Sequence, residues 1–378
     1  MTFLIISHTD HYKVDNQLYA YAPYVREMNL WLKYVDKVNI VAPISNDYDK
    51  NINLAYQHQD ISISEVQAFS LIGFKEKLRT LIRLPKILSR LYKAMRQAEH
   101  IHLRCPGNMG LLGCLVQILF PKTPKTAKYA GNWDPRAKQP WSYKLQKWIL
   151  SNTFLTKNMQ VLVYGEWPNQ TKNIKSFFTA SYHEDEKEDI YIRNYTQKLK
   201  FCFIGSLSKG KRPQLALELI DQLQQNDIDV EFNIYGNGDL KSQLRDWITQ
   251  HDAKSWAKLH GNQPKAVIKK ALKYSHFMIL PSQSEGWPKA VAEAMFWGCI
   301  PIVPRISCVP WMLAEGQRGI LMHPDDLQKD INQLKSLIHQ PEKLEQLSKS
   351  AAKWSRQYTL DRFEKEIKKL LIEKSKIN

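Results

Sequence analysis

Two glutamates eight positions apart, Glu285 and Glu293, are the most distinctive chemical feature of this sequence. Glu285 lies in the turn 284–289, which reads Ser-Glu-Gly-Trp-Pro-Lys and separates a predicted strand from a helical pattern that begins near Pro288. Backbone N–H groups at a helix start favour an anion, through the helix dipole and their open donors. A pyrophosphate would suit this turn. Glu293 lies among Ala, Val and Met, where a carboxylate needs hydrogen-bond donors because burying it unpaired is costly. A ribose diol offers two.

Glycines mark the ends of several predicted strands in the same half of the chain. Gly205, Gly236, Gly238, Gly261 and Gly286 each follow, or nearly follow, such a strand. Glycine lets a backbone approach a ligand closely, and ligands of open α/β sheets bind beyond the carboxyl ends of the strands. The five positions therefore indicate one binding edge. The alternative is that turns of this kind simply favour glycine.

Short apolar runs alternate with helical patterns along the whole chain, which predicts an α/β protein with largely parallel sheets. In the first half, strands are expected at 3–7, 38–42, 61–66, 101–103, 126–130, 161–164 and 177–180, and helices at 19–33, 78–97, 110–120 and 143–151. In the second half, strands are expected at 199–205, 230–235, 258–260, 277–280 and 300–303, and helices at 213–225, 240–250, 290–297, 325–339, 341–357 and 359–377.

The chain has 378 residues, which favours two domains. The acidic run 183–189 is the expected linker, because the strand–helix pattern restarts after it. We therefore predict a first domain at 1–188, a second at 189–358, and a final helix within 359–378 that packs back on the first domain.

The net charge of +17 suits nucleic acid, an anionic membrane or phosphorylated substrates as partners. Residues 75–96 contain eight Lys or Arg, one acid and an apolar stripe at helical spacing. They predict a basic amphipathic helix that Pro85 kinks or divides. Such a helix can lie on anionic lipid; the alternative is a surface helix whose apolar stripe faces its own core. No zinc finger, RNP-like strand or basic zipper supports nucleic acid.

Localisation is predicted from three weaker observations. The five cysteines have no metal or redox spacing and indicate buried, reduced thiols in the cytosol. No signal peptide is visible, and the apolar run 109–120 is too short to span a bilayer. We expect a cytoplasmic protein, with peripheral contact at the inner face of the plasma membrane through 75–96.

The pair Glu285 and Glu293 resembles the E-x7-E signature of retaining glycosyltransferases of the GT-B fold, family GT4 type. The resemblance extends from Phe203 to about Gly319 and includes the segments 235–238 and 298–302. It implies two Rossmann-like domains facing across a cleft, the second of which binds a nucleoside-diphosphate sugar. The implied contacts of that sugar nucleotide are Gly205, Ser206, Lys211, Arg212, Gly236, Asn237, Gly238, Asn262, Gln263, Glu285, Gly286, Trp287, Pro288, Lys289 and Glu293.

The resemblance also assigns roles to these residues. Glu293 would bind the ribose and Glu285 the hydroxyls of the transferred sugar, while Lys211 would stabilise charge on the leaving diphosphate. The arginine that usually accompanies this lysine is replaced by Ser206, for which Arg212 or Lys209 would compensate. The pair at 262–263 would meet the base; the alternative is that these are plain turn residues.

The same resemblance implies retention of configuration, with the departing phosphate acting as the base. No Asp-x-Asp motif suits a metal-bound diphosphate. The expected reaction is therefore metal-independent and needs no cofactor besides a sugar linked to UDP or GDP.

Loops of the first domain are expected to hold a glycan or lipid-linked acceptor of bacterial surface polysaccharide synthesis. The nominated acceptor contacts are His11, Tyr12, Lys13, Arg104 and Asn108. Asn132 and Asp134 are nominated as catalytic contacts in the loop 130–136, where relatives often carry a histidine; the alternative is a turn-forming role. Trp133, Trp141 and Trp148 are expected to pack in the core rather than to stack on sugars.

Other functions remain open at this point. A sugar-nucleotide epimerase or hydrolase of the same fold would hold a nucleoside diphosphate in the same way. A basic nucleic-acid-binding protein would explain the charge, and a non-catalytic subunit would explain the departures from the family pattern in the first domain.

Overall fold

The computed structural model describes residues 1–50, 52–67 and 74–372, and the chain forms two compact α/β units. Unit 1 comprises Met1–Phe178 with Phe363–Asn378, and unit 2 comprises Thr179–Arg362. The chain thus changes unit after Phe178, ten residues before the predicted division. Residues 179–188 belong to unit 2 because their side chains bond there; for example, Glu188 pairs with Lys269 and Lys273 of that unit.

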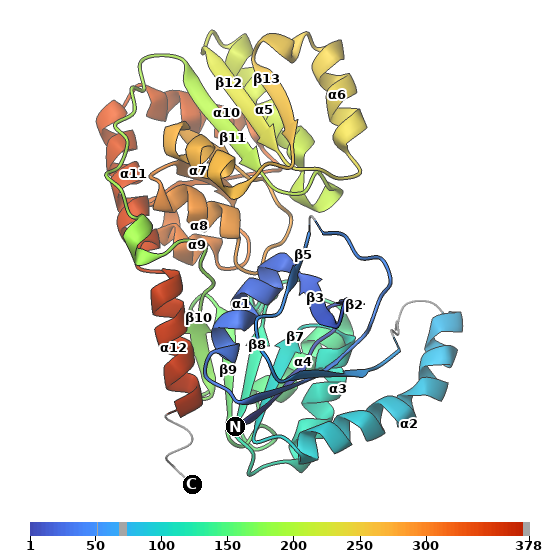
Figure 1. Cartoon of the computed structure of the whole chain (residues 1–378). Helices are drawn as coiled ribbons and strands as arrows, with labels where there is room; N and C mark the ends of the chain where they lie inside the picture. Colours follow the sequence, from blue (N-terminus) through green and yellow to red (C-terminus); the bar gives the residue numbers. More distant parts are fainter. Residues whose placement is uncertain (51, 68–73, 373–378) are drawn as a thin grey trace. The chain divides into compact units, whose positions relative to one another are not determined.

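Unit 1 is built on a seven-stranded parallel sheet with the order β10-β9-β8-β7-β1-β4-β6 (Figure 1). Its strands are β1 (Thr2–Ile6), β4 (Lys37–Ala42), β6 (Ile61–Glu65), β7 (His100–Cys105), β8 (Lys125–Tyr129), β9 (Met159–Tyr164) and β10 (Ile174–Phe177). The chain enters at β1 in the middle, builds outward to β6, and then returns to β7 beside β1. Residues 3–6 of β1 are fully buried, which explains their uninterrupted apolar sequence.

The helices of unit 1 are α1 (Ala22–Leu32), α2 (Phe74–Arg96), α3 (Asn108–Val116) and α4 (Trp141–Ser151), together with most of α12 (Leu360–Ile372). Helix α1 begins three residues later than predicted, because 17–21 is a strand. That strand, β3 (Gln17–Tyr21), lies between β2 (His11–Val14) and β5 (Asn53–Ala55) in a small antiparallel sheet. Helix α2 continues through Pro85 and bends along its length in Figure 1. The side chains of 74–79 and 81, part of the predicted basic helix, lie outside the described residues.

Unit 2 contains a six-stranded parallel sheet with the order β13-β12-β11-β14-β15-β16. Its strands are β11 (Leu199–Ile204), β12 (Val230–Tyr235), β13 (Ala257–Gly261), β14 (Phe277–Ile279), β15 (Ile300–Pro304) and β16 (Ile320–Met322). Its helices are α5 (Pro213–Gln225), α6 (Lys241–Gln250), α7 (Lys265–Tyr274), α8 (Lys289–Phe296), α9 (Val309–Met312), α10 (Leu327–Ile338) and α11 (Pro341–Ser355). Strand β16 and helices α7 and α9 were not predicted.

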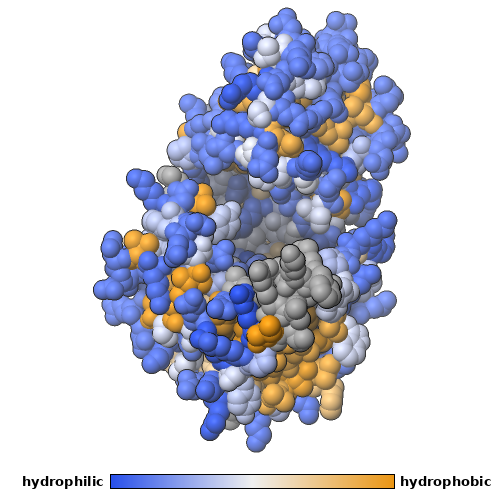
Figure 2. Space-filling model, turned by 90° about the vertical axis from the view of Figure 1, so that its right-hand side faces the viewer, coloured by the Kyte–Doolittle hydropathy of each residue, from blue (hydrophilic) through white to orange (hydrophobic). Residues whose placement is uncertain are grey.

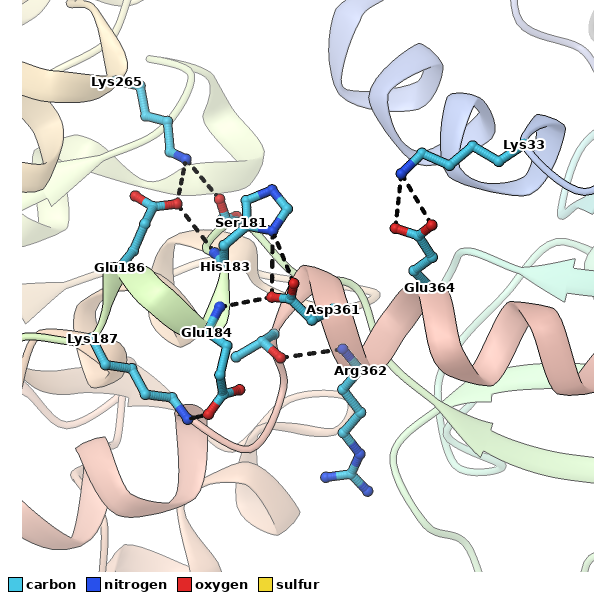
Figure 3. Close-up of polar contacts among 11 residues, drawn as sticks. Lys33, Ser181, His183, Glu184, Glu186, Lys187, Lys265, Asp361, Arg362 and Glu364 are labelled. Atoms are coloured by element: carbon cyan, nitrogen blue, oxygen red, sulfur yellow. Dashed lines mark hydrogen bonds and ion pairs between the residues drawn. The ribbon is translucent and has the colours of Figure 1, made fainter.

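Helix α12 is held to unit 1 by apolar and ionic contacts. Phe363 is buried against Phe177, with ring centroids 5.4 Å apart. Glu364 accepts two hydrogen bonds from Lys33 at 3.0 and 2.9 Å (Figure 3), and Lys175 pairs with Glu366 at 2.7 Å. Among the described residues, no helix is long and apolar enough to cross a membrane.

Candidate functional site

The sheet of unit 2 reverses its direction of growth between β11 and β14. The chain builds β11, β12 and β13 toward one edge and then β14, β15 and β16 toward the other. This is the order 3-2-1-4-5-6 of nucleotide-binding Rossmann-like folds, in which ligands bind beyond the carboxyl ends of the strands at the reversal. The loops after β11 and β14 meet at this point, and they contain Lys211 and Glu285.

Polar contacts join these two loops. Nζ of Lys211 donates to a carboxylate oxygen of Glu285, whose side chain is 10% exposed. The backbone N–H of Gln283 donates to the carbonyl of Gly210 at 2.8 Å. With its amide oriented to accept, Gln283 also receives both Nε and Nη2 of Arg212 at 3.2 Å. The fold therefore brings two of the predicted phosphate-binding cations to the strand reversal.

The loop after β12 lies against the loop after β11. Gly236 has a φ of +142°, and a Cβ at this position would lie 1.8 Å from the carbonyl oxygen of Gly205. Any side chain at Gly236 would therefore separate the two loops. Asn237 accepts a hydrogen bond from Lys241 at 2.8 Å, and Ser206 lies exposed with its hydroxyl 3.3 Å from that of Ser208.

The turn 284–288 is positioned by buried side chains on either side of it. The indole ring of Trp287 is buried and stacks against Trp354 at 6.1 Å, with Tyr358 at 5.5 Å. The carbonyl of Gly286 accepts from the hydroxyl of Ser307 at 3.2 Å. Trp287 therefore anchors the turn through its side chain and offers only its backbone to a ligand.

Helix α8 follows the turn and carries the second glutamate. Pro288 is its N-cap and provides no side-chain cap hydrogen bond, and Lys289 is its first residue. An uncapped helix start of this kind favours an anion.

Glu293 accepts a short hydrogen bond, 2.5 Å, from the hydroxyl of Ser181. Burial raises the pKa of the Glu293 carboxyl, while Ser181, Lys289 and Lys265 oppose the shift. The carboxylate is thus short of solvent and has one protein hydroxyl as a partner. A ribose hydroxyl would replace the Ser181 hydroxyl as the donor to this carboxylate. Sequence reasoning missed Ser181, since it lies 112 residues away in the chain.

Three further predicted residues of unit 2 follow β12 and β13. Asn262 and Gln263 are exposed after β13, and Gln263 donates to the carbonyl of His260 at 2.8 Å. Gly238 follows β12 in the same loop as Asn237. These residues lie at the carboxyl edge of the sheet, and the predicted contact of Asn262 and Gln263 with a base stays a prediction.

The sheet of unit 1 reverses its direction between β1 and β7, so its own loops also meet at one point. His8 lies exposed after β1, and a Cβ at Gly107 after β7 would lie 2.6 Å from its Nδ1. His11, which the sequence analysis nominated instead, is fully buried. Its Nδ1 lies 2.8 Å from the carbonyl of Thr9 and its Nε2 lies 2.8 Å from the hydroxyl of Tyr56. His8 is therefore the imidazole that the strand reversal presents, and its place directly after an apolar strand was the available signal.

The other acceptor-side nominations are spread over unit 1. Arg104 is largely buried and pairs with Glu27 at 2.8 Å. Tyr12 and Lys13 lie on β2, and Asn108 is the first residue of α3.

In the loop after β8, the nominated side chains of Asn132 and Asp134 make hydrogen bonds within the loop itself. The carboxamide of Asn132 accepts from the backbone N–H of Asp134 at 2.9 Å, and that carboxylate accepts from the N–H of Arg136 at 2.9 Å. Both are turn-forming contacts. The tryptophan prediction was right only for Trp133, which is buried; Trp141 and Trp148 are 66% and 60% exposed.

Within the described parts of the chain, no three His, Cys, Asp or Glu side chains come together as a metal site requires. The groups available to a ligand at the strand reversal of unit 2 are cationic side chains, carboxylates and backbone N–H groups.

A parallel sheet of this order defines a Rossmann-like domain, and cations and carboxylates lie at its reversal. The family model described as glycosyl transferases group 1 matches residues 184–354. The match covers somewhat less than half of the chain, and this segment is similar to that family.

Curated relatives extend the likeness over part of the chain. The amylovoran biosynthesis glycosyltransferase AmsK of Erwinia amylovora is 30% identical over 152 residues, which cover 38% of this chain and 37% of the relative. The putative colanic acid biosynthesis glycosyltransferase WcaL of Salmonella typhimurium is 28% identical over 137 residues, 34% of each chain. The chain thus spans about a third of the length of these relatives.

Solved structures resemble the whole chain. Sucrose-phosphate synthase of Thermosynechococcus elongatus has a TM-score of 0.69 at 13% identity and full coverage of both chains. Anabaena HepE in complex with UDP and glucose has a TM-score of 0.68 at 12% identity, covering 98% of this chain and 99% of that one. At such identities the likeness concerns the fold, and it confirms the predicted α/β class with two Rossmann-like domains.

Proposed function

We propose that this chain is a glycosyltransferase that moves a sugar from a nucleoside-diphosphate sugar to a glycan or lipid-linked acceptor. The observation that carries the proposal is the contact between Lys211 and Glu285 across the strand reversal of unit 2. A cation suited to phosphate and a carboxylate suited to sugar hydroxyls lie together there. The amylovoran and colanic acid enzymes among the relatives support surface-polysaccharide synthesis as the setting.

Lys211 would act on the leaving group. When the bond between the anomeric carbon and the phosphate oxygen breaks, negative charge develops on the β-phosphate. A fixed ammonium and the uncapped start of α8 stabilise that charge without reorganising at the moment of reaction. We propose that this stabilisation requires no metal ion.

Glu285 and Glu293 would hold the two ends of the substrate. Glu285 would accept hydrogen bonds from the transferred sugar, and its ion pair keeps Lys211 directed at the strand reversal. Glu293 would accept from the ribose in place of Ser181. We further propose retention of configuration, in which the departing phosphate takes the proton of the acceptor hydroxyl as the new glycosidic bond forms on the same face.

A thermal-shift panel of sugar nucleotides tests the first step. Because a ligand that binds only the folded state stabilises it by mass action, the true substrate should raise Tm by several degrees at concentrations far above its Kd. UDP-glucose is the first compound to test, since the solved HepE structure contains UDP and glucose. The proposal fails if no UDP- or GDP-sugar shifts Tm.

Product analysis separates transfer from the rival chemistry of the same fold. With the stabilising sugar nucleotide and lipid-linked glycan acceptors, transfer releases nucleoside diphosphate only when an acceptor is present. If an epimerised or hydrolysed sugar forms equally well without acceptor, the protein is an epimerase or hydrolase and not a transferase. Chelation by EDTA should leave the rate unchanged if metal independence is correct, and NMR of the product anomer tests retention.

We propose a cytoplasmic location for this reaction, where sugar nucleotides are made. A nucleic-acid-binding role finds support in the charge alone, and it predicts steeply salt-dependent binding of random duplex without any response to sugar nucleotides.

A further inference from the structure

Large hydrophobic side chains gather on one part of the surface of unit 1. Seven of those that are exposed in the described residues lie between positions 82 and 154, on α2, on α3 and the turn after it, and on or just after α4. They are Ile82, Tyr92, Leu115, Leu119, Trp141, Trp148 and Phe154. Exposed fractions reach 76% at Ile82 and 75% at Phe154. We call this set the α2–α4 face.

Contacts within unit 1 place these elements side by side. The ring of Tyr92 on α2 lies 5.4 Å from that of Phe120, just after α3. The amide of Gln117 donates to the carbonyl of Leu155 at 3.0 Å, which brings the end of α3 beside Phe154. Figure 2, which looks onto the side at the right of Figure 1, shows hydrophobic surface gathered on the part that contains α2 and α3.

The core of unit 1 does not need these side chains. The same helices bury other residues against the sheet, among them Leu91, Leu112 and Ile149. Trp141 and Trp148 are seven residues apart, close to two helical turns, so both project from one face of α4. The α2–α4 face is thus a second apolar surface of these helices, directed at solvent.

Positive charge concentrates in the same segment. Residues 80–158 contain fourteen Lys or Arg and two acids, Glu99 and Asp134, whereas the rest of the chain contains forty Lys or Arg and thirty-five acids. Lys93 on α2 and Lys144 on α4 are exposed, and Nζ of Lys157 lies 5.1 Å from the ring centre of Phe154. Lysines therefore border the apolar side chains.

Exposed apolar side chains bordered by lysines favour some classes of partner over others. A second copy of the chain would bring two strongly basic surfaces together. Nucleic acid would match the charge but leave exposed tryptophan, leucine and phenylalanine without a partner. An anionic bilayer matches both, because tryptophan favours the headgroup region and lysine extends its ammonium to lipid phosphates.

We propose that the α2–α4 face binds the surface of an anionic lipid bilayer, with Trp141, Trp148, Leu115, Leu119 and Phe154 entering the headgroup region. The interaction requires neither a sugar nucleotide nor turnover, so it stands apart from the proposed function. The proposed membrane contact includes α3 and α4 in addition to α2, where the sequence predicted it for residues 75–96.

Vesicle co-sedimentation of the full chain, without nucleotide, tests the proposal. The protein should bind vesicles of phosphatidylcholine mixed with phosphatidylglycerol and bind pure phosphatidylcholine far more weakly. Binding should fall in high salt, since the screening length drops to about 3 Å at 1 M. The double change Trp141→Ser and Trp148→Ser should lower the partition coefficient about tenfold or more.

Charge variants provide the second arm. Lys93→Glu and Lys144→Glu should each lower binding to the anionic vesicles by about fivefold or more, from the effect of one basic residue near an anionic surface. The matched controls lie on unit 2: Ile192→Ser, at a side chain that is 85% exposed, and Lys254→Glu, also exposed. Both should bind as the unchanged protein does.

Three results would overturn the proposal. One is equal binding of neutral and anionic vesicles. Another is loss of binding in the unit 2 controls to the same extent as in the α2–α4 variants. The last is that the protein does not bind vesicles, sediments as a dimer, and becomes monomeric when Trp141 and Trp148 are changed. That result would make the α2–α4 face a contact between two copies of the chain. Unchanged thermal unfolding of each variant excludes misfolding as the cause.

Discussion

Replacing Glu293 by Gln should make the protein more stable and a poorer binder of its sugar nucleotide. Glutamine keeps the shape of the side chain and an oxygen that can accept the hydroxyl of Ser181. It removes the charge of a carboxyl whose pKa is raised by burial. A residue that only supports the fold would show no such opposition between stability and binding.

The sign of the stability effect follows from linkage. Because the pKa of Glu293 is higher in the folded state than in the unfolded chain, the folded protein holds that proton more firmly. The protonated Glu293 carboxyl makes its full favourable contribution to the free energy of unfolding below the unfolded pKa of about 4.3. This contribution is lost as pH rises through the pKa of the folded state. At neutral pH the wild-type protein therefore bears a cost that Glu293→Gln removes. In a unit of this size, a gain of about 1 kcal/mol raises Tm by roughly 2–4 °C.

The binding effect follows from the hydrogen bonds that a ribose diol would make. A hydrogen bond to a charged group contributes about 1.5–3 kcal/mol and a neutral one about 0.5–1.5 kcal/mol. Two hydroxyls that lose a charged acceptor would then cost roughly 2 kcal/mol, which is about a thirtyfold increase in Kd.

Two measurements on the same variant test this reasoning. Thermal unfolding without ligand should show a Tm above wild type at pH 7.5 and a smaller difference at pH 4.5. Isothermal titration with the nucleoside diphosphate should show the weaker Kd. Glu342→Gln, at an exposed position in the first turn of α11, is the control and should change neither by much. A variant that is less stable than wild type and binds nucleotide equally well would refute the assignment of Glu293.

Three further predictions follow from the site and the fold. Lys211→Met should lower kcat about a hundredfold or more in a nucleotide-release assay, through lost stabilisation of the leaving group. Lys254→Met, at an exposed position in the short helical turn Ala253–Ser255 of unit 2, should stay near wild type, and equal losses in both would refute the assignment. Gly236→Ala should destabilise unit 2 by about 2–5 kcal/mol in urea unfolding, because its Cβ would lie 1.8 Å from a carbonyl oxygen, whereas Gly210→Ala meets no atom within 4 Å and should be neutral or slightly stabilising; similar unfolding midpoints would contradict this. His11→Gln should reduce acid destabilisation of unit 1 between about pH 6.5 and 4, since burial lowers the pKa of His11 to about 4 and the unfolded chain takes up the proton first; an unchanged pH profile of Tm would show that the imidazole does not control it.

The bounds of β11, β12 and α5 were predicted accurately, for a physical reason. Strands β11 and β12 are apolar runs bounded by glycine, and helix α5 begins at a proline. Each signal is local and each agrees with the parallel sheet in which the element lies.

The small antiparallel sheet of unit 1 was missed because its turn was not recognised. Asp15 and Asn16 both have positive φ, 47° and 61°, and connect β2 directly to β3. Two such residues favour the tight hairpin turns whose twist matches that of the strands. Apolar residues at helical spacing begin at Tyr19, so the predicted helix included residues that form the end of β3.

Pairs distant in sequence account for most of what was missed in the site. The hydroxyl partner of Glu293 comes from Ser181, and His8 approaches Gly107 only because β1 and β7 are neighbours in the sheet. From the sequence, Trp141 and Trp148 were expected to pack in the core. The sequence could not show that α4 turns a different face toward α3 and the sheet.

The contact between Ser181 and Glu293 connects the candidate site to the segment by which the chain enters unit 2. Ser181 also accepts a hydrogen bond from Lys265 through its carbonyl at 2.8 Å, and two residues later His183 lies 3.3 Å from Asp361 (Figure 3). The entering segment and the start of α12, by which the chain leaves unit 2, are thus bonded to each other. A ribose that displaces the Ser181 hydroxyl would remove one of the bonds that hold this segment. If Glu293 binds the ribose as proposed, sugar-nucleotide binding and the arrangement of the entering segment share one carboxylate. Because linkage is reciprocal, a change in either would then alter the free energy of the other.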